Sequence, residues 1–156
     1  MYKLIIFDAD GTLVTTKSGA TFRKTADDWQ WIHGRQSKIA LLHLQGIKLA
    51  IATNQGGVAF GYLDPHEIRA ELRKVAEEAH IPFTAMCFSH PQATIEQFKE
   101  DSPRRKPGAG MLLEVIQASG ESKKETLMVG DRPEDEQAAQ NAGVAFMWAE
   151  DFFHAG

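Results

Sequence analysis

The sequence predicts an α/β fold of three layers, in which a mainly parallel sheet is covered by helices on both faces. Short apolar runs alternate with amphipathic segments along the chain, which is the rhythm of repeated strand–helix–strand units. No internal repeat, low-complexity stretch or linker interrupts the 156 residues, a length that is typical of one domain. We therefore expect residues 1–156 to form a single domain.

Five strands and four helices are expected. The strands are short apolar runs, as found in sheets that are buried on both faces: Leu4–Phe7, Lys48–Thr53, Phe83–Ser89, Thr126–Val129 and Val144–Trp148. The helices carry apolar residues at helical spacing: Ser37–Gln45, a segment from Asp64 to Ala79, Gly110–Ala118 and Pro133–Ala142. The clearest helix start is Asp64-Pro65-His66-Glu67, with an Asp cap, proline at the first helical position and glutamate three residues after the cap.

Composition excludes several classes of protein. No apolar run approaches the roughly 20 residues of a membrane span, and the apolar run at the N-terminus is too short for a signal peptide. A single cysteine excludes an internal disulfide, so a cytoplasmic location is expected. The net charge of -4 argues against a broad nucleic-acid-binding face.

Polar clusters follow the predicted strands. They are Asp8–Thr12, Thr53–Gly57 and Gly130–Asp135, and Arg104–Pro107 precedes a predicted helix. Right-handed crossovers bring the carboxyl ends of parallel strands to one edge of the sheet, where ligands of such folds bind. We therefore expect the four clusters to converge there.

The residue types in these clusters point to phosphoryl transfer. Carboxylates with oxygen-only partners suit Mg²⁺. A threonine beside glycine-exposed backbone N–H groups suits a phosphate, and Lys106 suits the charge on a transferring phosphoryl group.

The ordered set of motifs resembles the haloacid-dehalogenase (HAD) superfamily, subfamily III type, and covers nearly the whole chain. The motifs are Asp-x-Asp-Gly-Thr, Thr-Asn-Gln, Arg-Lys-Pro and Gly-Asp-x-x-Glu-Asp. The middle of the chain is most similar to heptose-bisphosphate and histidinol-phosphate phosphatases, through residues 53–57, 87–91, 105–111 and 128–131. The flanks resemble the phosphatase domain of polynucleotide kinase/phosphatase, through residues 17–19, 28–29, 143–146 and 150–153. The resemblance implies a Rossmann-like core.

The resemblance also implies residue roles. Asp8 would be the nucleophile that forms an aspartyl-phosphate, and Asp10 the general acid and then the base. Mg²⁺ would be held by Asp8, the carbonyl of Asp10, Asp131 and Asp135. Phosphate or substrate would be bound by Thr53, Asn54, Arg105 and Lys106. Thr12 would either orient Asp10 or make a local turn.

The sequence differs from the sugar phosphatases at two motifs, and it has no room for a cap domain; all three features affect the choice of substrate. Ser102 and Arg104 stand where a zinc loop would carry a cysteine pair, although Cys87 and His90 are present, so we expect no zinc. The stretch after Thr12 lacks the Asn-x-Asp of those enzymes. Neither interval between the motifs has room for a separate cap domain, so we expect an open site.

We predict a Mg²⁺-dependent phosphomonoester hydrolase that acts on a small phosphorylated metabolite of the sugar-phosphate or histidinol-phosphate type. The alternative substrate is a polynucleotide 3′-phosphate, with nucleic acid bound only through its end. Two alternatives of another class are a receiver-like signalling domain with a phosphorylated Asp and a catalytically silent binding module. Asp10 argues against a receiver, which needs no general acid. The sequence predicts no oligomeric state.

Overall fold

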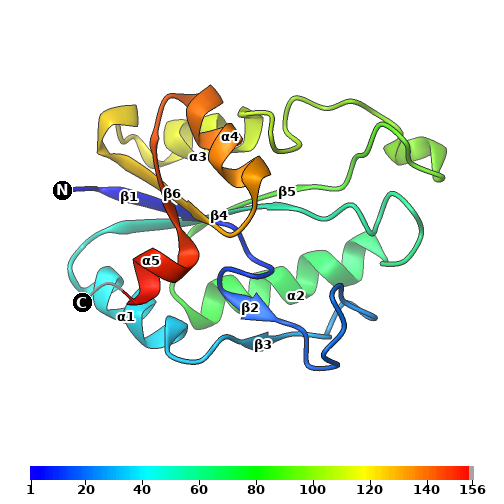
Figure 1. The fold of residues 1–156 in the computed structure, drawn as a ribbon, viewed down its shortest axis with the longest axis horizontal. Coiled ribbons are helices and arrows are strands. Elements are labelled where there is room, and N and C mark those ends of the chain that lie inside the picture. Colours follow the sequence, from blue (N-terminus) through cyan, green and yellow to red (C-terminus); the bar gives the residue numbers. More distant parts are fainter. Residues whose placement is uncertain (155–156) are drawn as a thin grey trace.

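The computed structural model describes residues 1–154, and its centre is a five-stranded sheet in the order β5-β4-β1-β6-β7 (Figure 1). Every neighbouring pair in this sheet is parallel. The strands are β1 (Leu4–Phe7), β4 (Lys48–Asn54), β5 (Phe83–Cys87), β6 (Thr126–Gly130) and β7 (Ala145–Trp148). The parallel, doubly covered sheet confirms the predicted fold class.

Helices cover both faces of the sheet, as Figure 1 shows. They are α1 (Arg35–Leu44), α2 (Pro65–Glu78), α3 (Gly110–Ser119), α4 (Pro133–Ala142) and α5 (Ala149–His154), with single 3-10 turns at Glu96–Phe98 and Lys123–Glu125. In α2, the side chain of Asp64 accepts the N–H of Glu67 at 3.0 Å, which confirms the predicted cap.

Alternate residues of β1 enter two separate cores. Leu4 and Ile6 join the cluster formed with α3 and α4, whereas Ile5 and Phe7 join the cluster formed with α1, α2 and α5. Because side chains alternate across a strand, a strand buried on both faces must be apolar at every position. This explains why the strands are continuous apolar runs rather than alternating patterns.

Several element boundaries differ from the predictions. β5 ends at Cys87 rather than Ser89, because its partner β4 ends at the opposing Asn54. β7 begins at Ala145, since the N–H of Val144 is used to close the end of α4 on the Ala139 carbonyl at 3.0 Å. α1 begins two residues earlier than expected, after Gly34, whose φ is 80°.

Two short strands and one α-helix were not predicted. β2 (Val14–Thr15) and β3 (Gln30–Trp31) form a short antiparallel ribbon, and two-residue strands carry no periodic signal. α5 packs its two phenylalanines against Phe7, with ring centroids 5.7 Å away for Phe152 and 5.9 Å for Phe153. None of the helices within residues 1–154 combines the length and apolar character that crossing a membrane requires.

The strand order reverses at β1. After β1 the chain builds β4 and then β5 on one side, and later returns to build β6 and β7 on the other side. The carboxyl end of β1 is therefore the topological switch point, where ligands of such sheets bind. Asp8 is the next residue after β1.

A long loop between β5 and α3 is tied down by Arg104. Its Nη1 donates to the Met86 carbonyl at 2.8 Å, its Nη2 donates to Glu114 of α3 at 3.2 Å, and its Nε also pairs with that carboxylate. Arg104 stands where a zinc loop would carry a cysteine. One guanidinium here connects the loop, a strand and a helix.

We expect Arg104→Ala to lower the free energy of unfolding by about 1–2 kcal/mol, since the carbonyl hydrogen bond contributes about 1 kcal/mol and the half-exposed ion pair contributes less than that. Thermal and urea denaturation measure this loss. Arg73→Ala, at an exposed position of α2, is the control and should leave stability within about 0.5 kcal/mol. Equal stability of the two variants would contradict the role of Arg104.

Candidate active site

A tight turn after β1 presents Asp8 and Asp10. The Ala9 carbonyl accepts the N–H groups of Leu13 at 2.9 Å and of Thr12 and Val14 at 3.2 Å each. Gly11 adopts a φ of 88°, and a Cβ at that position would lie 2.1 Å from Oδ2 of Asp131. The glycine is therefore required both by backbone conformation and by the close approach of the Asp131 carboxylate.

Lys106 is the central charge of the site. Its ammonium group donates to Oδ1 of Asp8 at 2.9 Å, Oδ1 of Asp135 at 2.7 Å and the Ala52 carbonyl at 2.8 Å. Its side chain is only 2% exposed, so all three donors are satisfied within the protein. Asn54 fixes the backbone of Lys106: its side-chain Nδ2 donates to the Lys106 carbonyl, and its Oδ1 accepts the Lys106 N–H, both at 3.0 Å.

Three carboxylates gather beside Lys106, two from the ends of β1 and β6 and one from the first turn of α4. Asp8, Asp131 and Asp135 each offer an oxygen, and these atoms lie within 4.8 Å of one another. Oδ2 of Asp135 accepts the backbone N–H groups of Asp131 and Arg132 at 3.1 Å each, at the start of α4. Thr12 donates its hydroxyl to Asp131 at 3.3 Å. Thr12 thus contacts Asp131, whereas the sequence suggested a contact with Asp10 or a local turn.

The cluster carries more negative than positive charge. Burial raises the pKa of Asp8 well above its usual range; Lys106 opposes the shift, while Asp135 and Asp131 add to it. Burial lowers the pKa of Lys106, but Asp8 and Asp135 more than offset this, so its pKa lies above the ordinary value and Lys106 stays protonated. A divalent cation would balance the excess negative charge of the cluster, and a set of ligand atoms made only of oxygens fits Mg²⁺.

Asp10 is held by two residues that the sequence analysis did not assign to the site. Oδ1 of Asp10 accepts Nε of Arg23 at 3.0 Å and Nη2 of Arg23 at 2.8 Å. Oδ2 of Asp10 accepts Nε2 of Gln55 at 3.0 Å. Gln55 could have been found, since it belongs to the Thr-Asn-Gln motif, but Arg23 lies in a loop without any recognisable pattern.

A cavity of about 600 Å³ opens over these groups. The predicted site residues that line it are Asp8, Asp10, Asn54, Arg105, Lys106, Asp131 and Asp135. Thr53 does not line it: the residue is fully buried, and its hydroxyl accepts Nε2 of Gln55 at 2.9 Å. Aromatic residues that sequence reasoning missed, Phe22, Phe60 and Tyr62, also line this cavity.

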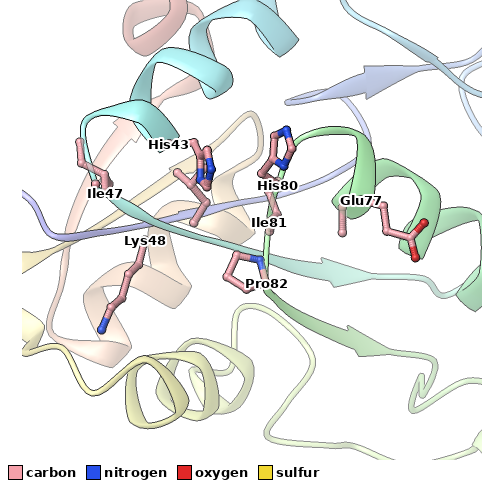
Figure 2. A pocket seen from close by; sticks show the side chains of 10 residues that line it. His43, Ile47, Lys48, Glu77, His80, Ile81 and Pro82 are labelled. Carbon is pink, nitrogen blue, oxygen red and sulfur yellow. The ribbon is translucent and has the colours of Figure 1, made fainter.

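A second hollow, of about 490 Å³, lies at the opposite edge of the sheet (Figure 2). It is lined by residues near the ends of α1 and α2 and the start of β4, and the rings of His43 and His80 stack there with centroids 4.8 Å apart. No carboxylate cluster accompanies the two histidines in the described residues, in which the one group of three possible metal ligands, Asp8, Asp131 and Asp135, lies at the other edge.

The comparisons with known proteins agree with the site. The family model described as "Polynucleotide kinase 3 phosphatase" matches residues 3–153. The D-glycero-beta-D-manno-heptose-1,7-bisphosphate 7-phosphatase of Rhodopseudomonas palustris is 30% identical over 125 residues, which cover 77% of this chain and 69% of that protein. The bifunctional polynucleotide phosphatase/kinase of Schizosaccharomyces pombe is 32% identical over 162 aligned positions, which cover 97% of this chain but only 37% of that protein.

One solved structure with a similar fold carries ligands of the expected kind. The D,D-heptose 1.7-bisphosphate phosphatase of B. bronchiseptica, crystallised with magnesium and phosphate, superposes with a TM-score of 0.75 at 29% identity, covering 92% of this chain and 78% of the other. These similarities favour a phosphatase over the receiver-like and silent-module alternatives. Because the family model spans nearly the whole chain and the relatives reach 30% identity, the chain belongs to the polynucleotide kinase 3 phosphatase family of HAD-superfamily phosphatases.

Proposed function

We propose that this protein is a Mg²⁺-dependent phosphomonoester hydrolase that acts through an aspartyl-phosphate on Asp8, with a small phosphorylated metabolite as substrate. The observation that carries the proposal is the buried Lys106 between Asp8 and Asp135, with Asp131 completing a carboxylate cluster. Uncatalysed hydrolysis of phosphate monoesters is extremely slow, so nucleophile, acid, cation and metal must act together.

The contacts of Asp8 support its role as the nucleophile. Asp8 lines the cavity, Lys106 donates to its Oδ1, and no group within residues 1–154 donates a hydrogen bond to its Oδ2. Oδ2 attacks phosphorus as the bond from phosphorus to the leaving oxygen breaks, and Asp10 gives that oxygen a proton. Water then attacks the aspartyl-phosphate, Asp10 takes a proton from the water, and inorganic phosphate leaves with Asp8 restored.

Asp8, Asp131 and the carbonyl of Asp10 are the proposed inner ligands of Mg²⁺. When bound, the ion neutralises the phosphoryl oxygens. Asp135 already accepts hydrogen bonds from Lys106 and from the N–H groups of Asp131 and Arg132, so we place it in the outer sphere, where it orients Asp131. Lys106 would neutralise the charge of the phosphate, and Arg105 would contact the substrate. Asn54 supports them by holding the backbone of Lys106, whereas the buried Thr53 contacts Gln55.

The relatives support two substrate classes. The heptose-bisphosphate phosphatases favour a small sugar phosphate, and the family model and the yeast relative favour a polynucleotide 3′-phosphate. The net charge of -4 favours the small metabolite, since a nucleic-acid track needs a basic surface. We also propose a cytoplasmic location, because Cys87 is a free, buried thiol and residues 1–154 contain no disulfide. A screen against phosphorylated metabolites and 3′-phosphorylated oligonucleotides tests the substrate directly.

Asp8→Asn is expected to reduce turnover of the best substrate by at least about 10³-fold, because the amide is no nucleophile. The substitution removes one negative charge from a crowded cluster and leaves Lys106 paired with Asp135, so the melting temperature should change little. Asp27→Asn, at an exposed loop position, is the control and should keep full activity. Turnover by Asp8→Asn above a contamination blank would refute the nucleophile assignment.

Removing divalent metal with a chelator should abolish turnover, and added Mg²⁺ should restore it. Asp131→Asn should raise the Mg²⁺ concentration needed for half-maximal activity, because it removes a charged ligand from the cluster. Asp101→Asn, at an exposed loop position, should not change that concentration. Metal analysis of protein purified without added metal should find no zinc, and stoichiometric zinc would overturn that expectation.

The salt dependence of kcat/KM distinguishes the two substrate classes. A single-stranded polynucleotide that contacts Z phosphates gives a log–log slope of about −0.7Z. We expect a shallow slope, corresponding to one or two bound phosphates. A steep slope, together with a preference for an oligonucleotide 3′-phosphate over its mononucleotide, would establish the polynucleotide as the substrate.

A further inference from the structure

We propose that Arg23 is a positioning residue that holds the carboxylate of Asp10 in the orientation needed for proton transfer to the leaving group. This inference rests on the proposed function, in which Asp10 is the general acid. Arg23 donates to Oδ1 of Asp10 through Nε at 3.0 Å and through Nη2 at 2.8 Å. Its third nitrogen, Nη1, donates to the Ala26 carbonyl at 2.8 Å.

The burial of Arg23 is unusual for its loop. Its side chain is 3% exposed, while its neighbours Phe22 and Lys24 are exposed. Burying a guanidinium costs free energy unless the charge is paired. Here the guanidinium donates to the Asp10 carboxylate and to the Ala26 carbonyl. The loop therefore turns one cation inward, toward Asp10, and leaves the adjacent cation in solvent.

Asp10 needs such support because its side chain projects from a buried turn and is partly exposed. Its side chain is 38% exposed, and the turn alone fixes only its backbone. Arg23 binds one oxygen of the carboxylate and Gln55 binds the other, at 3.0 Å, so the two residues together fix the rotation of the side chain. Arginine cannot itself donate a proton to a leaving group at neutral pH. Arg23 also lines the cavity, but its three nitrogens already donate to Asp10 and to the Ala26 carbonyl, so we assign its action to Asp10.

The loop is braced on both sides of Arg23. Asp28 accepts the N–H of Ser18 at 2.9 Å, the hydroxyl of Ser18 at 2.7 Å and the N–H of Lys24 at 3.0 Å. These bonds, with the Lys24 N–H as the largest cause, lower the pKa of Asp28 to about 2, so it stays ionised over the working pH range. The brace joins residue 18 to the residue that follows Arg23, which presents the guanidinium at a constant position.

Two substrates with different leaving groups distinguish a positioning role of Arg23 from a general structural role. Nitrophenolate departs without a proton, so formation of the aspartyl-phosphate from 4-nitrophenyl phosphate does not depend on Asp10, whereas an alkoxide from glycerol 2-phosphate requires the proton. General acid catalysis contributes roughly 10²–10⁴-fold. Arg23 should therefore affect the first chemical step only for the alkyl substrate.

The experiment compares Arg23→Ala with Lys24→Ala, which removes the neighbouring cation of the same loop. We expect Arg23→Ala to slow the single-turnover cleavage of glycerol 2-phosphate by at least about tenfold. Its single-turnover release of nitrophenolate from 4-nitrophenyl phosphate should keep its rate constant within about threefold, whereas steady-state turnover of that substrate should be slower, because Asp10 also acts as the base in the second step. Asp10→Asn should give the same pattern, and Lys24→Ala should match the unmodified protein.

Thermal denaturation monitors the fold of each variant. If Arg23→Ala does not fold, Arg23→Lys replaces it: lysine keeps the charge but lacks the planar fork, so a smaller loss that is still selective for the alkyl substrate is expected. Equal losses for both substrates, or no loss for the alkyl substrate, would overturn the positioning role while turnover by the unmodified protein upholds the phosphatase. If the unmodified protein hydrolyses neither substrate, the proposed function fails, and this inference with it.

Discussion

A single buried ammonium group is the constraint on which the site depends. Lys106 sits among Asp8, Asp135 and the Ala52 carbonyl, and each of its donors has a partner within the protein. An unpaired charge at this depth would be prohibitively costly, so the surrounding chain must supply carboxylates at hydrogen-bonding distance. The same carboxylates, in excess over the one lysine, create the negative field that a divalent cation balances.

The sheet topology makes that arrangement possible. Asp8 follows β1, Asn54 ends β4, and Asp131 follows β6, and these are three adjacent parallel strands. Lys106 comes from the loop before α3 and is held against β4 by Asn54. Because the strand order reverses at β1, the loops after β4 and β6 diverge and leave the cavity between them.

Loops support the parts of this region that the sheet does not reach. Arg104 ties the long loop after β5 to Met86 and Glu114. Arg23 and Gln55 hold Asp10 from opposite sides, in a chain whose intervals between motifs form small elements rather than a cap. Both loops use the planar guanidinium of an arginine, which can join a carboxylate to a backbone carbonyl.

The sequence by itself determined the layers, the five sheet strands and the four motifs, because doubly buried strands need continuous apolar runs and strand-end chemistry is local in sequence. The tertiary structure alone decided which motif residues touch. Thr12 meets Asp131, Asn54 meets the backbone of Lys106, and Thr53 lies behind the cavity. It also decided that Arg23 reaches Asp10 and that α5 packs on β1. Such contacts depend on how a loop or a short element folds back on the sheet, and this is a matter of packing between distant segments that leaves no periodic pattern in the sequence.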